Sequence, residues 1–246
     1  MRAAILSDIH SNWPALRAVA KDIATMGVDV IYCLGDVTGY GPFPRECIAW
    51  AREHCNLTLM GNHDFGVGHG CNMANHNYPA LLAMAQNAKM LKADDLAFLR
   101  GLEMAMDIPN LGISMVHANW TDPDGWEYIR NEHIARQQLT AVATPVLFFG
   151  HTHQPAIYHI KHGLVKLGMS HSPLEVRFPS KFAINVGSVG QPRDDDPRAC
   201  YMVVDFFRHK LLAEYRRVSY RIDETVAEMK KLNLDGILTK RLYEGS

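Results

Sequence analysis

Three features are scarce in this sequence of 246 residues: paired cysteines, surplus charge and long apolar runs. The five cysteines form an odd set without a C-x-x-C pair, which argues against a disulfide framework and fits a reducing cytoplasm. The 25 basic residues nearly balance the 26 acidic ones, so the composition gives no strong signal for nucleic-acid binding. No apolar stretch approaches a membrane span, and the N-terminal one is too short for a signal-peptide core. We therefore expect a cytoplasmic protein that holds any anionic substrate at a local site.

The first third of the chain alternates short apolar runs with amphipathic stretches. This pattern predicts strand, helix, strand, helix and strand, at 3–6, 14–26, 30–34, 44–54 and 57–60. Such an order is typical of a largely parallel sheet with helices packed on it. The glycine-rich stretch 65–78 has no clear period, which predicts a loop or lid. Two short helices are predicted to follow within 80–102, so that 65–102 would form an insertion beside the cleft.

Strand patterns dominate the second half of the chain. They predict strands at 113–116, 146–149, 156–160, 182–186 and 201–206, then a further strand at 210–217 and a closing helix at 224–232. Because no second run of crossover helices is evident, we expect this half to be more antiparallel. No repeat, low-complexity tract or linker interrupts the pattern. The sequence therefore predicts a single domain, residues 1–246, built as a sandwich.

Five separate motifs of metal-binding residue types follow predicted strands. They are Asp8-Ile9-His10, Gly35-Asp36, Gly61-Asn62-His63-Asp64, Val116-His117 and Gly150-His151-Thr152-His153. Open α/β sheets place their binding crevices at such strand ends. Two of the motifs space their ligands i, i+2, so both side chains of each pair can project to one side of an extended backbone. Mixed carboxylate, amide and imidazole ligands suit divalent Mn, Fe, Zn, Ni or Co.

In kind and order, these motifs resemble the calcineurin-like metallophosphoesterase superfamily, whose pattern is D-x-H, GD, GNH-D/E, H and GH-x-H. The resemblance implies an α/β fold, a four-layer αββα sandwich of two mixed sheets flanked by helices, with a dinuclear metal site at the strand ends. It also implies the ligands. One ion would be held by Asp8, His10, Asp36 and His153, and the other by Asp36, Asn62, His117 and His151. Asp36 would bridge the two ions, and a hydroxide between them would attack the phosphate ester.

Four residues outside the ligand set are candidates for binding or catalysis. His63 matches the family histidine that faces the substrate and can protonate the leaving group, and Asp64 is expected to orient its imidazole. Arg193 either binds a phosphate oxygen or pairs with the acids at 194–196 or with another loop carboxylate. Asn12 either reaches a phosphate or caps the following helix.

A third metal site at His69, Cys71 and His76 has irregular spacing and no fourth ligand, so the interpretation as part of the lid is favoured.

The sequence narrows the substrate class without fixing it. It departs from the Ser/Thr protein phosphatases of the superfamily, which carry an arginine after the second motif and another before the third. The compact length and the segment 185–193 look more like small bacterial and archaeal phosphodiesterases and dinucleoside-polyphosphate hydrolases. A phosphodiester or nucleotide substrate is therefore favoured, with a protein phosphatase or other phosphomonoesterase as the alternative. A non-catalytic interaction scaffold is disfavoured, because no ligand is lost. The native metals and the oligomeric state stay open.

Overall fold

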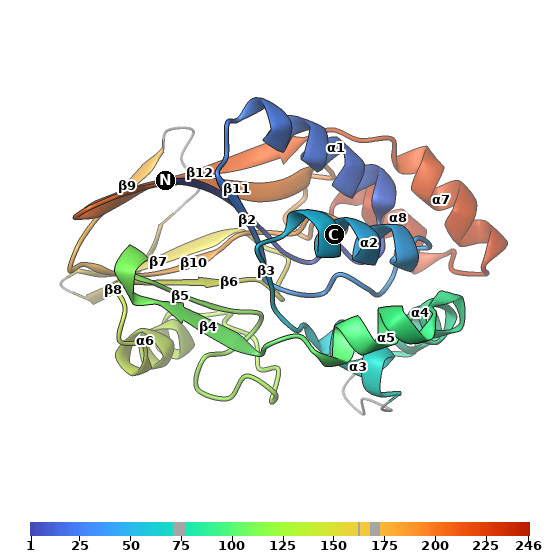
Figure 1. Cartoon of the computed structure of the whole chain (residues 1–246), viewed down its shortest axis with the longest axis horizontal. Helices are drawn as coiled ribbons and strands as arrows, with labels where there is room; N and C mark the ends of the chain where they lie inside the picture. The colour runs from blue at the N-terminus through green and yellow to red at the C-terminus, as the bar shows by residue number, and fades with distance from the viewer. Residues whose placement is uncertain (71–76, 162, 168–172) are drawn as a thin grey trace.

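Two mixed β-sheets stacked face to face form the centre of the computed structural model, which describes residues 1–70, 77–161, 163–167 and 173–246 (Figure 1). The first sheet has the order β3-β2-β1-β11-β12-β9. Its strands are β1 (Arg2–Leu6), β2 (Val30–Cys33), β3 (Leu57–Thr58), β9 (Leu174–Arg177), β11 (Ala199–Phe207) and β12 (Lys210–Val218). The second sheet has the order β4-β5-β6-β10-β7-β8. Its strands are β4 (Ala105–Ile108), β5 (Ile113–Val116), β6 (Val146–Phe149), β7 (Ala156–Lys161), β8 (Gly163–Leu167) and β10 (Lys181–Asn185).

The alternation of side chains along the strands joins the two sheets. In β1, Ala3 and Ile5 belong to a buried cluster that also contains side chains of the second sheet, such as Met115 of β5 and Phe148 of β6. Successive residues of a strand point to opposite faces, so Ala4 and Leu6 of the same strand face the helices instead. The main apolar core thus lies between the sheets.

Helices cover the outer faces of both sheets (Figure 1). The first sheet is covered by α1 (Trp13–Thr25) and α2 (Pro44–His54), whose apolar sides pack on Leu6 and Tyr201. On the second sheet, α6 (Glu132–Ala141) packs its Leu139 against Phe149. The four-layer αββα arrangement is therefore confirmed. No helix in the described ranges is long and apolar enough to cross a membrane.

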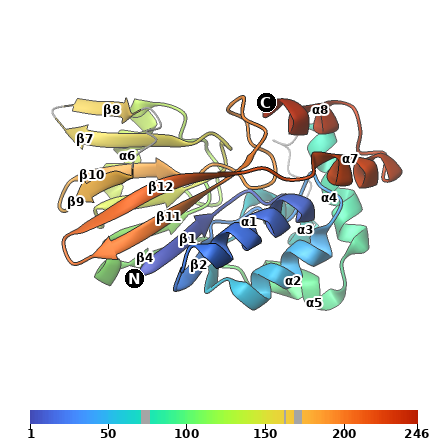
Figure 2. The ribbon, with the colours of Figure 1, turned by 90° about the horizontal axis from the view of Figure 1, so that it is seen from above.

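The remaining helices gather at the end of the molecule where Figure 2 shows α3, α4, α7 and α8 near one another. Their bounds are α3 (Asn62–His69), α4 (Tyr78–Met90), α5 (Ala93–Arg100), α7 (Ile222–Lys231) and α8 (Ile237–Glu244), and a short 3-10 helix, η1, spans Pro109–Leu111. Tyr40 shares an apolar cluster with residues of α4, α7 and α8, including Ala83, Met229 and Leu242. This cluster joins the C-terminal helices to the loop that follows β2.

The second half of the chain is more antiparallel than the first, as expected, with two parallel pairs among its described strands. Strands β7, β8, β11 and β12 pair antiparallel, but β6 pairs parallel with both β5 and β10. The sequence pattern missed α6, which is the crossover between β5 and β6. Its apolar side is short, with Ala135 and Leu139 as its buried apolar residues. Strands β4, β8 and β9 and helix α8 were also not predicted.

The prediction of a loop over 65–78 was wrong at both of its described ends. Helix α3 continues to His69 and ends with Gly70 in a left-handed conformation, while α4 already begins at Tyr78. The glycines of α3 have a packing role, since a Cβ on Gly68 would lie 3.2 Å from the Cβ of Leu99 in α5. Cys71 and His76, and with them the proposed third metal site, lie outside the described residues.

The contact of α6 with the second sheet predicts a stability effect. Leu139 is 1% exposed, so Leu139→Ala should lower the free energy of unfolding by about 2–5 kcal/mol, through lost burial and the cavity left behind. Gln137→Ala, on the exposed side of the same helix, should change it by less than about 0.5 kcal/mol. Urea denaturation followed by circular dichroism measures both. Equal effects of the two variants would contradict the observed orientation of α6.

Candidate dinuclear metal site

The sequence motifs meet where neighbouring strands of the two sheets end. Asp8 and His10 follow β1, Asp36 follows β2 and Asn62 follows β3, all in the first sheet. From the second sheet, His117 follows β5, and His151 and His153 follow β6. Strands that run parallel within a sheet end at the same edge, which is why motifs far apart in the sequence converge here.

The backbone is strained at the motif residues. Asp8, His10, Asp36, His151 and His153 all have positive φ values, from 48° to 64°. Non-glycine residues seldom adopt this left-handed conformation, and such strain concentrates at functional sites. These five positions are all ligands implied by the sequence motifs.

Two glycines allow the strand-end loops to approach one another. A Cβ on Gly35, whose φ is +109°, would lie 2.6 Å from the backbone nitrogen of Gly61. A Cβ on Gly150 would lie 2.6 Å from Oδ2 of Asp8. The same Oδ2 accepts a hydrogen bond of 3.0 Å from the backbone N–H of His151. Asp8 thereby joins the two sheets at the site.

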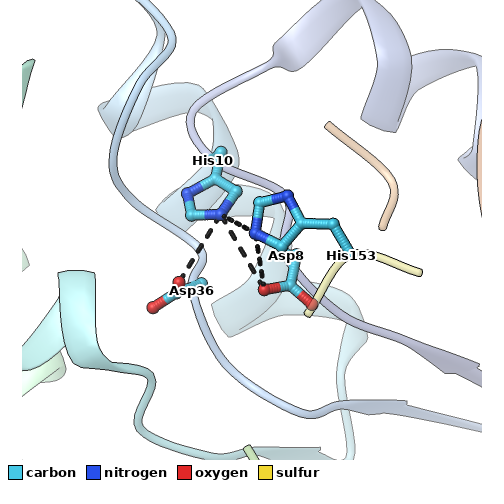
Figure 3. A group of neighbouring side chains, drawn as sticks. All are labelled: Asp8, His10, Asp36 and His153. Atoms are coloured by element: carbon cyan, nitrogen blue, oxygen red, sulfur yellow. Dashed lines mark hydrogen bonds and ion pairs between the residues drawn. The ribbon is translucent and has the colours of Figure 1, made fainter. Parts of the chain in front are cut away.

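One group of converging side chains contains Asp8, His10, Asp36 and His153 (Figure 3). Nε2 of His10 lies 3.0 Å from Nε2 of His153 and 3.5 Å from Oδ2 of Asp36. Nε2 of His153 lies 3.3 Å from Oδ1 of Asp8. These four residues form the ligand set that the sequence implied for one metal ion.

A second group contains Asp36, His117 and His151. Nε2 of His117 lies 3.5 Å from Oδ2 of Asp36 and 3.2 Å from Nδ1 of His151. Oδ2 of Asp36 is thus at the same distance from His10 of the first group and from His117 of the second. Asn62 is buried and borders a cavity that lies beside these ligands. The position of Asp36 agrees with the bridging role implied for it.

Backbone carbonyls fix the orientation of all four imidazoles. Nδ1 of His10 lies 3.0 Å from the carbonyl oxygen of Thr38, and Nδ1 of His117 lies 3.0 Å from that of Leu34. Nδ1 of His153 lies 2.6 Å from the carbonyl oxygen of Gln191. Nε2 of His151 lies 3.0 Å from the carbonyl oxygen of Trp126. In each ring the nitrogen facing the carbonyl must carry the proton, so the other nitrogen of a neutral ring presents a lone pair.

These lone pairs point at one another. Two neutral imidazole nitrogens that both lack hydrogen cannot bond at 3.0 Å, as in the pair His10 and His153. Oδ1 of Asp8 is also buried and accepts no hydrogen bond. A cation between these atoms satisfies all of them. At His117 and His151, whose nitrogens are 3.2 Å apart, either a proton on His117 or a metal ion satisfies the facing nitrogens. The side chains therefore fit two divalent metal ions.

The charges of the buried cluster favour the metal-binding forms of most ligands. Burial alone would raise the pKa of Asp36, but His117 and His63 hold it well below its usual value. Burial lowers the pKa of His10 and of His151 to about 3, so both rings are neutral. Burial would also lower the pKa of His117, yet the charge and hydrogen bond of Asp36, together with the charges of Asp8 and Asp64, outweigh it and raise this pKa to about 9. A metal ion bound at His117 must therefore displace a proton.

Asp64 stabilises the loop that carries Asp36. Its carboxylate accepts hydrogen bonds from the backbone N–H groups of Val37 and Thr38, at 3.1 and 2.9 Å, and from that of Gly61 at 3.3 Å. The hydroxyl of Thr38 donates a further bond of 2.9 Å. These bonds fix the loop around Asp36 and the start of α3. Orientation of the His63 ring by Asp64 stays a prediction.

Asn12 caps α1, which was one of its two expected roles. Its Oδ1 accepts from the backbone N–H of Ala15 at 3.3 Å and from the hydroxyl of Thr225 at 2.8 Å. Its Nδ2 donates to the carbonyl of Gly190 at 2.8 Å. Both polar atoms are thus engaged inside the protein, and Asn12 does not line the large cavity beside the metal ligands. The structure gives no support for substrate binding by this residue.

Arg193 lines that cavity and does not pair with the acids that follow it. Asp194 forms an ion pair with Arg217, and Asp196 with Arg198 at 2.6 Å. The Arg193 guanidinium donates instead to Oε1 of Gln191, through Nε at 3.3 Å and Nη2 at 2.7 Å. Among the described residues, Arg193 forms no ion pair with these acids, and phosphate binding by Arg193 stays a prediction.

The sequence motifs did not reveal the aromatic walls of the cavity. Its volume is about 370 Å³, and it is bounded by the ligands Asp36, Asn62, His151 and His153, by His63 and by four aromatic side chains: Tyr40, Phe65, Trp126 and Tyr128. Tyr40 shows a weak signal in the sequence, because it follows the second motif between two glycines. Trp126 and Tyr128 lie in a long segment without periodicity, where residues far from the motifs fold back over His151.

Buried carboxylates and imidazoles that fit two metal ions beside an open cavity define the class of two-metal phosphoesterases. The calcineurin-like phosphoesterase superfamily domain matches residues 1–208 of the sequence, and the chain belongs to this superfamily. It is accordingly a metal-dependent phosphoester hydrolase with a dinuclear site.

Known proteins resemble this chain over nearly its whole length. An uncharacterized protein of Methanocaldococcus jannaschii is 33% identical over 244 residues, which are 98% of this chain and 97% of that protein. The crystal structure of a metallophosphoesterase from Sphaerobacter thermophilus is 35% identical, with a TM-score of 0.85, and covers 100% of this chain and 99% of its own. A hypothetical protein from Pyrococcus horikoshii has the same fold at 19% identity, with a TM-score of 0.77 and coverage of 100% and 98%.

The geometry around Asp36 predicts a joint loss of metal and activity. Asp36→Asn replaces one bridging oxygen by an amide nitrogen that has no free lone pair, so the two ions can no longer share the side chain. We expect fewer than two ions per chain, by elemental analysis after loading with manganese, and a loss of activity of at least about a hundredfold. Asp94→Asn, at an exposed position of α5, is the control and should keep both. Full occupancy and activity in Asp36→Asn would contradict the bridge.

Proposed function

We propose that this chain hydrolyses phosphodiester or phosphoanhydride bonds of small nucleotide-like substrates. The observation that carries the proposal is the cavity itself, because metal-ligand residues and four aromatic side chains line one space. A volume of about 370 Å³ is in the range of small-molecule sites. A nucleotide matches this combination, since its phosphate is an anion and its base is a flat ring.

Neighbouring side chains hold the aromatic rings of the cavity in place. Tyr128 contacts the ring of His151, with ring centroids 4.1 Å apart, and the guanidinium of Arg130, 3.9 Å from the Tyr128 centroid. Phe65 and Trp126 are tilted neighbours at 6.1 Å. Aromatic side chains contribute about 1–3 kcal/mol for each stacked base, largely without regard to base identity. Asn77 and Asp124 also line the cavity and offer polar groups for the edge of a base.

Different residues of the site are assigned to metal binding, to proton transfer and to holding the loop of Asp36. The implied ligands Asp8, His10, Asp36, Asn62, His117, His151 and His153 would hold two divalent ions, which when bound polarise the phosphoryl oxygens and activate water. His63 lines the cavity, with its ring 4.7 Å from that of His10 and 4.6 Å from that of Tyr40. We assign it the transfer of a proton to the leaving oxygen. Asp64 would hold the loop of Asp36 in place.

The experiment that tests this function is a substrate panel. Protein loaded separately with manganese, zinc or iron is assayed against nitrophenyl monoesters and diesters, cyclic nucleotides, dinucleoside polyphosphates and a phosphoserine peptide. We expect the highest kcat/KM on diesters or dinucleoside polyphosphates. Preference for the phosphopeptide would instead support the protein-phosphatase alternative. Absence of turnover with every metal would support the non-catalytic scaffold.

The proton transfer assigned to His63 predicts that its removal lowers kcat by an amount that depends on the leaving group. An alkyl or nucleoside alkoxide carries much negative charge in the transition state, whereas nitrophenolate needs little protonation. His63→Ala should therefore lower kcat by on the order of a hundredfold on a nucleoside ester and by less on a nitrophenyl ester, with both metals retained.

The control for this variant is His133→Ala, at an exposed position of α6, which should leave both rates unchanged. Equal losses on the two esters would assign His63 to stabilising phosphoryl charge instead. Loss of a metal ion from His63→Ala would make it a ligand or a structural residue.

A further inference from the structure

The C-terminal helix α8 lies beyond the matched domain, yet it borders the active-site region. Its Leu238 and Leu242 share an apolar cluster with Tyr40, which lines the cavity. The backbone N–H of Asp195 donates to the carbonyl of Gly245 at 2.8 Å, which joins the end of α8 to the loop that carries Arg193. A Cβ on Gly245 would lie 2.6 Å from the backbone of Asp196, so the two segments are in close contact.

This contact brings a second arginine close to Arg193. Arg241 precedes Leu242 and lies one helical turn before Gly245, whose N–H donates to the Arg241 carbonyl at 2.8 Å. Burial and the positive charge of Arg193 lower the pKa of Arg241, while Tyr40 and Tyr128 in the cavity wall raise it. Arg241 is half-buried and lies four residues before Gly245, on the face of α8 that contacts the loop carrying Arg193.

Two acids beside Arg193 and one on α8 are bound to other partners, whereas Asp195 is exposed. Arg217 and Arg198 neutralise Asp194 and Asp196, and Glu244 pairs with Lys240 at 3.6 Å. Within the described ranges, the Arg241 guanidinium forms no hydrogen bond or ion pair. Arg193 donates two of its five N–H groups to Gln191 and lies beside Tyr40, so only part of its donor capacity is used.

Two guanidinium groups in one neighbourhood that form no ion pair with an acid of the described residues repel each other, and a bound anion removes that cost. Guanidinium groups bind phosphate oxygens through a planar fork of donors, which makes a phosphate group a fitting anion. Gln191 adds a link to the metal ligands, because its carbonyl accepts from His153 while its side chain holds Arg193. The arginine pair is thus held in a fixed relation to the metal site.

We propose that Arg193 and Arg241 form a subsite for a second phosphate group of the substrate, next to the phosphate that is held at the metal site. The subsite rests on the proposed function and narrows it to nucleotides with at least two linked phosphates, such as nucleoside diphosphate derivatives and dinucleoside polyphosphates. Substrates with a single phosphate leave the pair unfilled and bind more weakly.

The test compares binding of two phosphonate analogues that cannot be hydrolysed, one of AMP and one of ADP, to the manganese-loaded protein by calorimetry. Wild type should bind the ADP analogue at least about tenfold more tightly. Arg241→Gln should weaken the ADP analogue by about tenfold or more, the effect of losing hydrogen bonds to a charged group, and the AMP analogue by less than about twofold. Arg241→Lys should recover part of the loss, because it keeps the charge without the fork.

The matched control is Lys240→Gln, which removes one positive charge from the same helix at an exposed position. It should change the binding of neither analogue, and melting temperatures of all variants should agree with wild type. Three results would overturn the subsite: no preference of wild type for the ADP analogue, equal weakening of both analogues in Arg241→Gln, or the same loss in Lys240→Gln.

Hydrolysis measured in parallel separates this inference from the proposed function. Binding of the ADP analogue that depends on Arg241, in a protein that turns over nothing in the substrate panel, would retain the subsite and reject the proposed function. Turnover of diesters with kcat/KM unchanged by Arg241→Gln, including that for dinucleoside polyphosphates, would retain the function and reject the subsite.

Discussion

The convergence of unshared electron pairs at the strand ends is the constraint on which this structure depends. Four imidazoles and two carboxylates meet in a buried space, with ring nitrogens of His10 and His153 at 3.0 Å and those of His117 and His151 at 3.2 Å. Backbone carbonyls hold each ring from its far side, so the facing nitrogens cannot turn away. Such an arrangement is repulsive without cations and favourable with them, which links metal binding to the stability of this end of the sandwich.

Loops distant in the sequence hold this arrangement together. The segment after β10 returns against the loop after β1, where the hydroxyl of Ser188 and the N–H of Gly190 both donate to the carbonyl of Asp8, at 2.8 and 2.9 Å. Asp64 does the same for the loop after β2, and its hydrogen bonds from Val37 and Thr38 fix Asp36 from behind. The left-handed conformations of the ligand residues are maintained by these bonds, since isolated loops would relax out of them.

Chemistry and recognition come from different parts of the fold. The implied ligands follow strands of the two packed sheets, and the rigidity of those strands sets their positions. The walls that face the substrate come from α3 and α4, from the segment around Trp126 and from the loop that carries Arg193, with α8 packed behind. This division lets members of one superfamily keep the metal site while loops and added helices change the substrate.

From the sequence alone, most of the strands, the αββα class and a candidate ligand set could be predicted, because local periodicity and short motifs carry that information. Strands β5 and β6 were placed at their observed bounds, and each motif lies where a strand ends. Only the tertiary structure decided that α3 continues through its glycines, that α6 connects the parallel strands β5 and β6, that Asn12 caps a helix and that Asp64 binds backbone. It alone brought Tyr128 onto His151 and Arg241 towards Arg193. The physical reason is separation along the chain: such contacts depend on how distant segments pack, and no local pattern encodes that.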